Sequence, residues 1–353
     1  MIGIRSRIEA PLISQEGRPR RLTPFWTIAS VFALILNIAF ASPAQNIPSS
    51  EKDGRLVEQQ KILAGSDDPG KRADAARALG QLGSGKAVKA LLRSLEDDER
   101  EVREQAILAL GQLRSRDAVP PLINILQTNE DLRLRSASAF ALGLIGDRRA
   151  VVPLVAELKN STEDSRKNII VALGLLGDPR AVKPLLSIPH DAEHKGCAPI
   201  AIALGQIKSG VPSDKLFSWL NGAEGDICPN AAIALVLIGG KKQVGPLIQV
   251  LASEDPISRR SAAFALGSLK DKRAVLPLIA LLNDVDVKVR LNTIEALELI
   301  RDKRAVEPLE RVVLSDRDQD VRVRAAEAIK VILAGGNRSA AHSYLPISDL
   351  PLS

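Results

Sequence analysis

Aromatic side chains are scarce in this chain: Phe, Trp and Tyr together make up 3% of its 353 residues. After Ala41 the aromatic residues are Phe140, Phe217, Trp219, Phe264 and Tyr344. Proteins that bind single-stranded nucleic acid stack the bases on aromatic rings, and sugar-binding sites use similar platforms. The composition therefore argues against both kinds of site.

Histidine is also rare, with three copies. Only His190 and His194 lie close together, and they fall in a polar segment where solvated side chains are expected in any case. A catalytic zinc site needs three protein ligands. The Gly-rich run from Gly80 to Lys86 imitates a phosphate-binding loop, but Ala87 stands where Ser or Thr must hold the metal. We therefore predict no catalytic residues, no metal and no cofactor.

The first 41 residues differ from the rest. Arg18, Arg20 and Arg21 precede an uncharged apolar stretch over residues 25–41, which ends in the small-x-small pattern Ala39-Phe40-Ala41. This pattern favours a cleaved signal peptide over residues 1–41. The alternative is an uncleaved signal anchor, which would be the only part of the chain to contact a membrane. In both cases we expect the remainder outside the cytoplasm, in the periplasm or the extracellular space.

Charge is nearly balanced once this segment is set aside. Residues 1–41 hold five Arg and two Glu, so their removal lowers the formal net charge from +6 to +3. A nucleic-acid-binding protein normally shows a concentrated basic stripe. We therefore predict no nucleic-acid partner.

What the chain has in abundance is a repeat, marked by the phrase Ala-Leu-Gly. The third position of this phrase recurs every 31 or 32 residues, at Gly80, Gly111, Gly143, Gly174, Gly205, Val236, Gly267, Glu298 and Lys330. A unit of this length cannot bury its own apolar face and must stack on its neighbours. We predict an all-α fold: a right-handed α-solenoid of about nine paired-helix repeats over residues 55–334, after a linker over 42–54 and before a flexible C-terminal tail over 335–353.

Each unit carries signals for two helices. The first begins at Ala-Val-x-Pro-Leu, because Pro is tolerated in the first turn of a helix. The second begins after an acidic residue or Thr, which acts as N-cap. Four positions after that cap, seven units carry Arg: Arg72, Arg103, Arg135, Arg166, Arg259, Arg290 and Arg322.

The phrases Ala-Val-x-Pro-Leu, Val-Arg and Ala-Leu-Gly resemble the HEAT-like repeats of phycobiliprotein lyases. The resemblance implies a paired-helix solenoid and leaves activity open, since fold-level analogy does not carry function. A related HEAT-like enzyme, deoxyhypusine hydroxylase, binds iron through His-Glu pairs. This chain has only the reversed pair Glu193-His194, so the resemblance does not imply that activity here.

The two cysteines, Cys197 and Cys228, occupy the Arg position in the two remaining units. Equivalent positions of stacked helices face each other, and export would favour oxidation. Regular helix stacking at about 8–10 Å, however, exceeds the Cα separation that a disulfide allows. A disulfide and two separately buried thiols both remain open.

An apolar stripe follows one face of the second helices. Six central units are apolar three positions before the Gly site, and three of these are also apolar four positions later, on the same face. We call these nine residues the second-helix stripe: Leu108, Phe140, Leu144, Val171, Leu175, Ile202, Ile233, Leu237 and Phe264. We predict that it forms a partner-binding groove on the concave side. The alternative is that it is buried, by tight curvature or in a homodimer.

Three functions are compatible with these features. The favoured one is an exported, non-enzymatic scaffold that binds another protein or peptide on its concave face. The second is an accessory or chaperone-like subunit of an enzyme, as in a lyase. The least favoured is a metal-dependent enzyme centred on His190 and His194.

Overall fold

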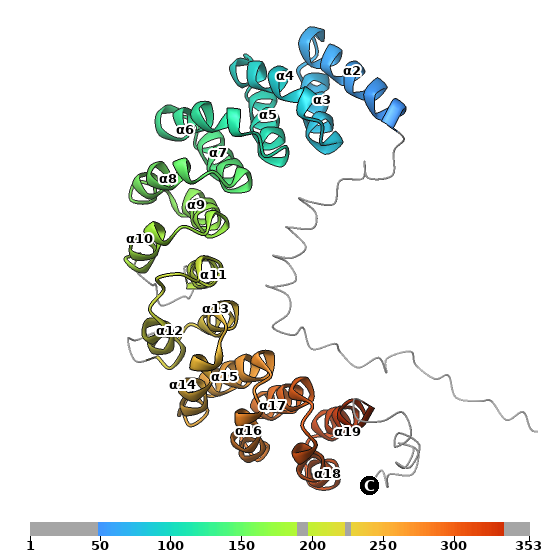
Figure 1. Ribbon diagram of the computed structural model, residues 1–353, viewed down its shortest axis with the longest axis vertical. Helices are drawn as coiled ribbons and strands as arrows, with labels where there is room; N and C mark the ends of the chain where they lie inside the picture. The colour runs from blue at the N-terminus through green and yellow to red at the C-terminus, as the bar shows by residue number, and fades with distance from the viewer. Residues whose placement is uncertain (1–48, 189–196, 223–226, 335–353) are drawn as a thin grey trace, which may run out of the picture. The chain divides into compact units, whose positions relative to one another are not determined.

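The computed structural model describes residues 49–188, 197–222 and 227–334 (Figure 1). The chain divides into two units, residues 1–46 and 47–353, and the first lies wholly outside the described residues. So do the predicted signal segment, the C-terminal tail and all three histidines. Across the described ranges every regular element is helical, as expected for an α-solenoid.

The helices alternate between two roles and form nine pairs over the described residues, which we number units 1 to 9. The first helices of units 1 to 9 are α2 (Ser49–Gly65), α4 (Val88–Arg93), α6 (Val119–Thr128), α8 (Val151–Leu158), α10 (Val182–Leu186), α12 (Ser213–Leu220), α14 (Val244–Val250), α16 (Val275–Leu281) and α18 (Val306–Ser315). The second helices are α3 (Pro69–Leu82), α5 (Arg100–Gln112), α7 (Leu132–Ile145), α9 (Glu163–Leu176), α11 (Cys197–Ile207), α13 (Asn230–Ile238), α15 (Pro256–Leu269), α17 (Val287–Ile300) and α19 (Gln319–Ala334).

Short 3₁₀ helices accompany these pairs. One, η3 (Ser94–Glu96), follows α4, and seven others lead directly into first helices: η2 (Gly85–Ala87), η4 (Arg116–Ala118), η5 (Arg148–Ala150), η6 (Pro179–Ala181), η7 (Lys241–Gln243), η8 (Lys272–Ala274) and η9 (Lys303–Ala305). The predicted Ala-Val-x-Pro phrase thus marks the start of five first helices, α6, α8, α10, α16 and α18.

The predicted linker over residues 42–54 is wrong at its C-terminal end, because α2 begins at Ser49. Two features stabilise helix there. Glu51 lies in the first turn, where a carboxylate complements the helix dipole, and it pairs with Arg55 one turn later. Leu56 and Leu63 are buried, at 3% and 5% exposed, in the face of α2 that packs on α3. The first unit is therefore a complete helix pair, with Ala-Leu-Gly in α3 but without the Ala-Val-x-Pro phrase in α2.

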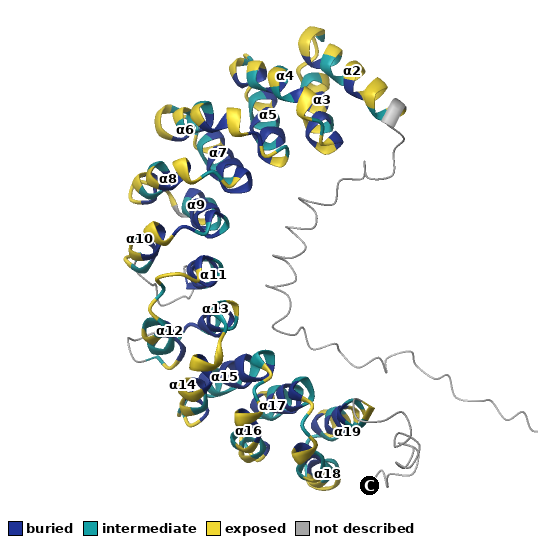
Figure 2. Ribbon diagram, viewed as in Figure 1, coloured by how far each residue is buried: buried dark blue, intermediate teal, exposed yellow. Residues whose placement is uncertain are grey.

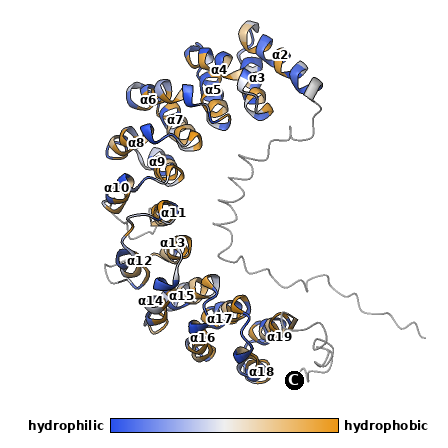
Figure 3. Cartoon of the chain, viewed as in Figure 1, coloured by the Kyte–Doolittle hydropathy of each residue, from blue (hydrophilic) through white to orange (hydrophobic). Residues whose placement is uncertain are grey.

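The described helices form two layers, one of first helices and one of second helices (Figure 1). Second helices of successive units pack side by side, α3 on α5, α5 on α7 and onward to α19. Figure 2 shows that this layer is the more deeply buried one, from α7 to α15 in particular. Hydrophobic residues lie between helices while the inter-unit turns are hydrophilic (Figure 3). The core is thus continuous along the stack, and each unit contacts chiefly its neighbours.

The Ala-Leu-Gly phrase owes its regularity to this close stacking. The Gly of one unit lies against the Ala of the next: a Cβ built on Gly143 would come within 2.6 Å of the Ala172 Cα, and one on Gly267 within 2.5 Å of the Ala296 Cα. The same Gly-on-Ala contact occurs at Gly80, Gly111, Gly174 and Gly205. The intervening Leu residues, such as Leu142 and Leu266, are fully buried. The phrase therefore encodes helix packing and no chemistry.

Candidate partner-binding face

The second-helix stripe is assembled from six consecutive second helices, α5 to α15. Each of these helices contributes the residue three positions before the Gly site, while α7, α9 and α13 add the residue one turn later. Because the helices stack one beside the next, these side chains follow one another along a single layer. The structure thus aligns all nine predicted residues.

The stripe is intermediate in burial. Leu144, Ile202 and Ile233 are buried, at 7%, 7% and 8% exposed, and Leu237 is 37% exposed. The other five are half-buried: Leu108, Phe140, Val171, Leu175 and Phe264. Core leucines of the same helices, such as Leu142 and Leu266, are 0% exposed. The stripe is therefore accessible to solvent along most of its length. Its exposure is lowest at α11 and at the start of α13.

Beyond both ends of the stripe, the equivalent positions carry charged side chains that form ion pairs. At the N-terminal end the equivalent position is Arg77, which pairs with Asp74 at 3.0 Å. At the C-terminal end the equivalent positions are Glu295 and then Glu327, and Arg324 pairs with Glu327 at 3.7 Å and with Glu298 at 2.5 Å. The apolar surface is thus confined to the middle of the stack by charged side chains.

The repeated Arg side chains donate hydrogen bonds to the turn that joins the two helices of a unit. The Arg290 guanidinium donates to the Asp284 carbonyl oxygen at 2.9 Å and to both carboxylate oxygens of Asp316, in the next unit, at 2.8 and 2.9 Å. Arg259 makes the same bridge to Asp284, and Arg72 makes it to Asp97. This bidentate geometry is the strong form of the Arg–carboxylate pair. These bridges, which we call the Arg ladder, tie unit 1 to unit 2, unit 7 to unit 8 and unit 8 to unit 9.

The structure joins Cys197 and Cys228 in a disulfide, with their Cα atoms 6.0 Å apart. These cysteines, at the starts of α11 and α13, are 4% and 1% exposed. The Cα separation is below the regular helix spacing because the disulfide joins the N-terminal ends of two short second helices, at Cys197 and just before Asn230. The disulfide occupies the ladder position in the two units that lack Arg. Its covalent bond replaces the ion-pair bridge between units 5 and 6.

A second set of bridges lies at the opposite edge, in the inter-unit turns. Asp271 accepts hydrogen bonds from the Arg273 side chain and backbone N–H, while Arg273 Nη2 donates to the Lys241 carbonyl oxygen of the preceding turn at 2.9 Å. The side-chain hydrogen bond from Arg273 is the main reason that the pKa of Asp271 falls to about 2. Equivalent arginines lower the pKa values of Asp178 and Asp302 to about 2 as well. None of the three carboxylates is thereby suited to proton transfer near neutral pH.

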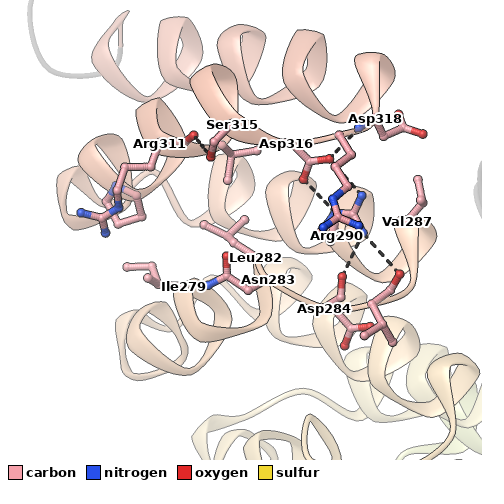
Figure 4. Close-up of a pocket in the computed structure, with 14 residues that line it drawn as sticks. Ile279, Leu282, Asn283, Asp284, Val287, Arg290, Arg311, Ser315, Asp316 and Asp318 are labelled. Atoms are coloured by element: carbon pink, nitrogen blue, oxygen red, sulfur yellow. Dashed lines mark hydrogen bonds and ion pairs between the residues drawn. The ribbon is translucent and has the colours of Figure 1, made fainter.

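Two cavities lie beside Arg–carboxylate bridges of the ladder. One of about 900 Å³ opens between units 8 and 9, beside the Arg290–Asp316 pair, with Leu282 and Val312 on its apolar side (Figure 4). A smaller one of about 360 Å³ lies beside the Arg72–Asp97 pair between units 1 and 2. Both lie between the helix-to-helix turns of successive units, and the Arg and Asp of the ladder that line them are paired to each other. They resemble features of the stacking more than a substrate site.

Neither a metal site nor a membrane span is found within the described ranges. No group of three or more His, Cys, Asp or Glu side chains there has the arrangement to hold a metal ion. The metal hypothesis on His190 and His194 falls outside these ranges. In the same ranges no helix is both long and apolar enough to cross a bilayer, and the apolar stretch over residues 25–41 lies outside them.

Comparison with solved structures finds distant similarities. They include human deoxyhypusine hydroxylase in complex with glycerol, with 21% identity and a TM-score of 0.34, covering 81% of this chain and 98% of that one. An engineered protein has 21% identity and a TM-score of 0.38, covering 84% and 99%. The CpcE–CpcF complex of phycocyanin lyase from Nostoc sp. PCC7120 has 22% identity and a TM-score of 0.37, covering 82% and 97%. With TM-scores below 0.5, these similarities carry no conclusion about this chain.

Comparison of sequences gives the family. No curated protein matches the chain. The profile described as HEAT repeats matches residues 60–143, 119–205 and 244–330, which is more than half of the chain and agrees with the helix pairs of the structure. The chain therefore belongs to the HEAT-repeat family.

Proposed function

We propose that this protein is a non-enzymatic scaffold that binds another protein, or a segment of one, along the second-helix stripe, and that it works outside the cytoplasm. The observation that supports this most strongly is the burial of the stripe. Its side chains are less buried than the core leucines of the same helices, yet they remain apolar through six units. Packing alone does not require apolar side chains at such half-buried positions.

The shape of the stripe favours an elongated ligand. Its residues recur once or twice per helix along a row of parallel helices, so a partner would contact them in series. An amphipathic helix or an extended segment presents apolar side chains at regular intervals and uses grooves of this kind. The ion pairs at units 1 and 9 would set the limits of the bound segment. Working outside the cytoplasm is supported only by the pattern over residues 1–41 and by the Cys197–Cys228 disulfide, which an oxidising compartment preserves.

Affinity capture with matched variants tests the proposal. Phe140, Ile202 and Phe264 are changed together to Ser, and the control changes Val152 and Leu276 to Ser, which are 61% and 63% exposed in the first-helix layer. We expect a partner captured by the wild type and by the control to be lost with the stripe variant, while all three proteins keep their helical circular dichroism.

Two results would contradict the proposal. If the stripe variant still captures the partner, the partner binds elsewhere. If the stripe variant instead converts a dimer into a monomer in sedimentation experiments and no partner is found, the stripe is a homodimer interface.

A further inference from the structure

The near balance of the total charge conceals a row of basic side chains on one edge of the solenoid. The turns before α14, α16 and α18, at residues 239–243, 270–274 and 301–305, contain eight basic and two acidic residues. Six of the basic side chains are exposed and form no hydrogen bond or ion pair with any described residue, and we call these the basic strip: Lys241, Lys242, Lys270, Lys272, Arg301 and Lys303.

Hydrogen bonds between the turns make the strip continuous. The Arg273 guanidinium donates to the Lys241 carbonyl oxygen at 2.9 Å, and that of Arg304 donates to the Lys272 carbonyl oxygen at 3.1 Å. Each turn therefore lies directly beside the next. The two acidic residues, Asp271 and Asp302, are already paired with Arg273 and Arg304. The strip thus presents an uncompensated positive surface across three units.

The helix dipole accounts for only part of this pattern. Cations are favoured at the C-terminal ends of helices, which explains Lys270 after α15 and Arg301 after α17. Lys241, Lys272 and Lys303 instead lie in the 3₁₀ turns that open first helices. There the dipole presents its positive end, so a cation is disfavoured. Neither the helix dipole nor a hydrogen bond or ion pair accounts for lysine at these positions.

Backbone conformation gives a second, independent indication. Lys270 and Arg301 have φ values of 53° and 56°, in the left-handed region that equivalent positions in other units give to Gly83, Gly146 and Gly177. A side chain costs conformational energy there. Among the described residues, all four non-glycine positions with positive φ carry Lys or Arg. Basic side chains are thus retained where the backbone favours glycine.

We propose that the basic strip binds the surface of an anionic phospholipid bilayer. Protein interfaces have an apolar core, whereas the large exposed apolar side chains next to these turns, among the described residues, are Leu276, 63% exposed at the start of α16, and Leu237, 37% exposed near the end of α13. The three turns also contain no aromatic residue on which nucleic-acid bases could stack. Lysines with flexible stems attract lipid phosphates without defined geometry, and Leu276 is placed to enter the interface beside them. The strip lies on the inter-unit turns and shares no residue with the second-helix stripe, so different variants test the two proposals and each can fail without the other.

Vesicle sedimentation with the full chain tests this inference. The strip variant K241Q/K242Q/K272Q/K303Q is compared with K71Q/K89Q/K288Q/K330Q, which removes four exposed lysines from elsewhere in the solenoid. Vesicles contain either phosphatidylcholine alone or equal parts of phosphatidylcholine and phosphatidylglycerol. We expect the wild type and the control variant to bind the anionic vesicles, with binding weakened by added salt. Each lysine near a charged surface strengthens binding roughly fivefold, so the strip variant should bind at least tenfold more weakly. Its melting temperature should stay close to that of the wild type, because these exposed side chains form no hydrogen bond or ion pair with any described residue.

Three outcomes would overturn the inference. Equal binding of the strip variant and the wild type to anionic vesicles would show that other residues bind lipid. Equal binding of the wild type to both kinds of vesicle would show that apolar residues, and not the strip, attach the chain to membranes. Tighter binding of the wild type to duplex DNA than to anionic vesicles, lost in the strip variant, would assign the strip to nucleic acid.

Discussion

Changing Gly267 to Ala should destabilise the solenoid, although alanine is the better helix former. A Cβ at this position would lie 2.5 Å from the Ala296 Cα and 2.8 Å from its Cβ, while ordinary contacts begin near 3.4 Å. These atoms belong to the backbone of α17 and the Cβ fixed to it, so no side-chain rotation relieves the overlap. Helices α15 and α17 would have to separate by nearly 1 Å, which is the difference between those distances.

The magnitude follows from two opposing effects. Overpacking a well-packed core costs about 1–3 kcal/mol, and replacing Gly by Ala inside a helix returns about 0.5–1 kcal/mol. We expect a net loss of about 1–2 kcal/mol. Gly245 in α14 is the matched control, since a Cβ there meets no atom within 4 Å. Gly245→Ala should therefore leave stability unchanged or raise it by up to about 1 kcal/mol.

Urea denaturation followed by circular dichroism compares the two variants with the wild type. The midpoints are compared directly, because repeat proteins can unfold in steps. The reasoning predicts midpoints that move in opposite directions. If Gly267→Ala raises the midpoint as Gly245→Ala does, the Gly-on-Ala contact does not limit the helix spacing and our explanation of the Ala-Leu-Gly phrase is wrong.

Three further predictions concern the bridges between units. Reducing the Cys197–Cys228 disulfide, which closes 31 residues of chain, should lower the free energy of unfolding by about 3–4 kcal/mol in the chain-entropy model, and equal urea midpoints for oxidised and reduced protein would refute this. Arg290→Met should cost about 3 kcal/mol because it leaves the buried Asp316 carboxylate unpaired, while R290M/D316L should recover much of that loss; thermal denaturation of both variants decides. Because the folded pKa values of Asp178, Asp271 and Asp302 are about 2, below the unfolded value, their stabilisation is complete above about pH 4 and is lost as the pH falls toward 2. Melting temperatures between pH 5 and 2 should therefore fall less steeply for D178N/D271N/D302N than for the wild type, and equal slopes would contradict this assignment.

Much of the fold could be predicted from the repeat. The spacing of Ala-Leu-Gly gave the number of units, and the position of Pro in Ala-Val-x-Pro located the first helices, as α16 and α18 confirm. The prediction missed the start of α2, because residues 49–54 were assigned to the linker. This helix lacks Ala-Val-x-Pro and begins in a stretch rich in Ser and polar residues. A weaker indication of the helix was present, because Leu56 and Leu63 are seven residues apart and so lie on the same helical face.

The candidate site was less predictable, since it depends on how the units stack. The repeat register predicted that Cys197 and Cys228 occupy equivalent positions in neighbouring units. Their Cα separation of 6.0 Å depends on how closely α11 and α13 approach each other, which the register does not specify. Register also aligned the second-helix stripe, whereas the difference between buried Ile202 and exposed Leu237 depends on neighbouring side chains. The basic strip was missed because the net charge averages over both edges. Aligning the inter-unit turns with one another would have revealed it.

Site-specific photo-crosslinking tests the central claim of partner binding most directly. A photoreactive amino acid replaces Leu237, the most exposed residue of the stripe, or Leu276 in the first-helix layer. In cells that produce the protein, we predict that position 237 forms a crosslink to one other protein and that position 276 does not. Equal crosslinking at both positions, or a product at position 237 that contains only two copies of this chain, would contradict the claim.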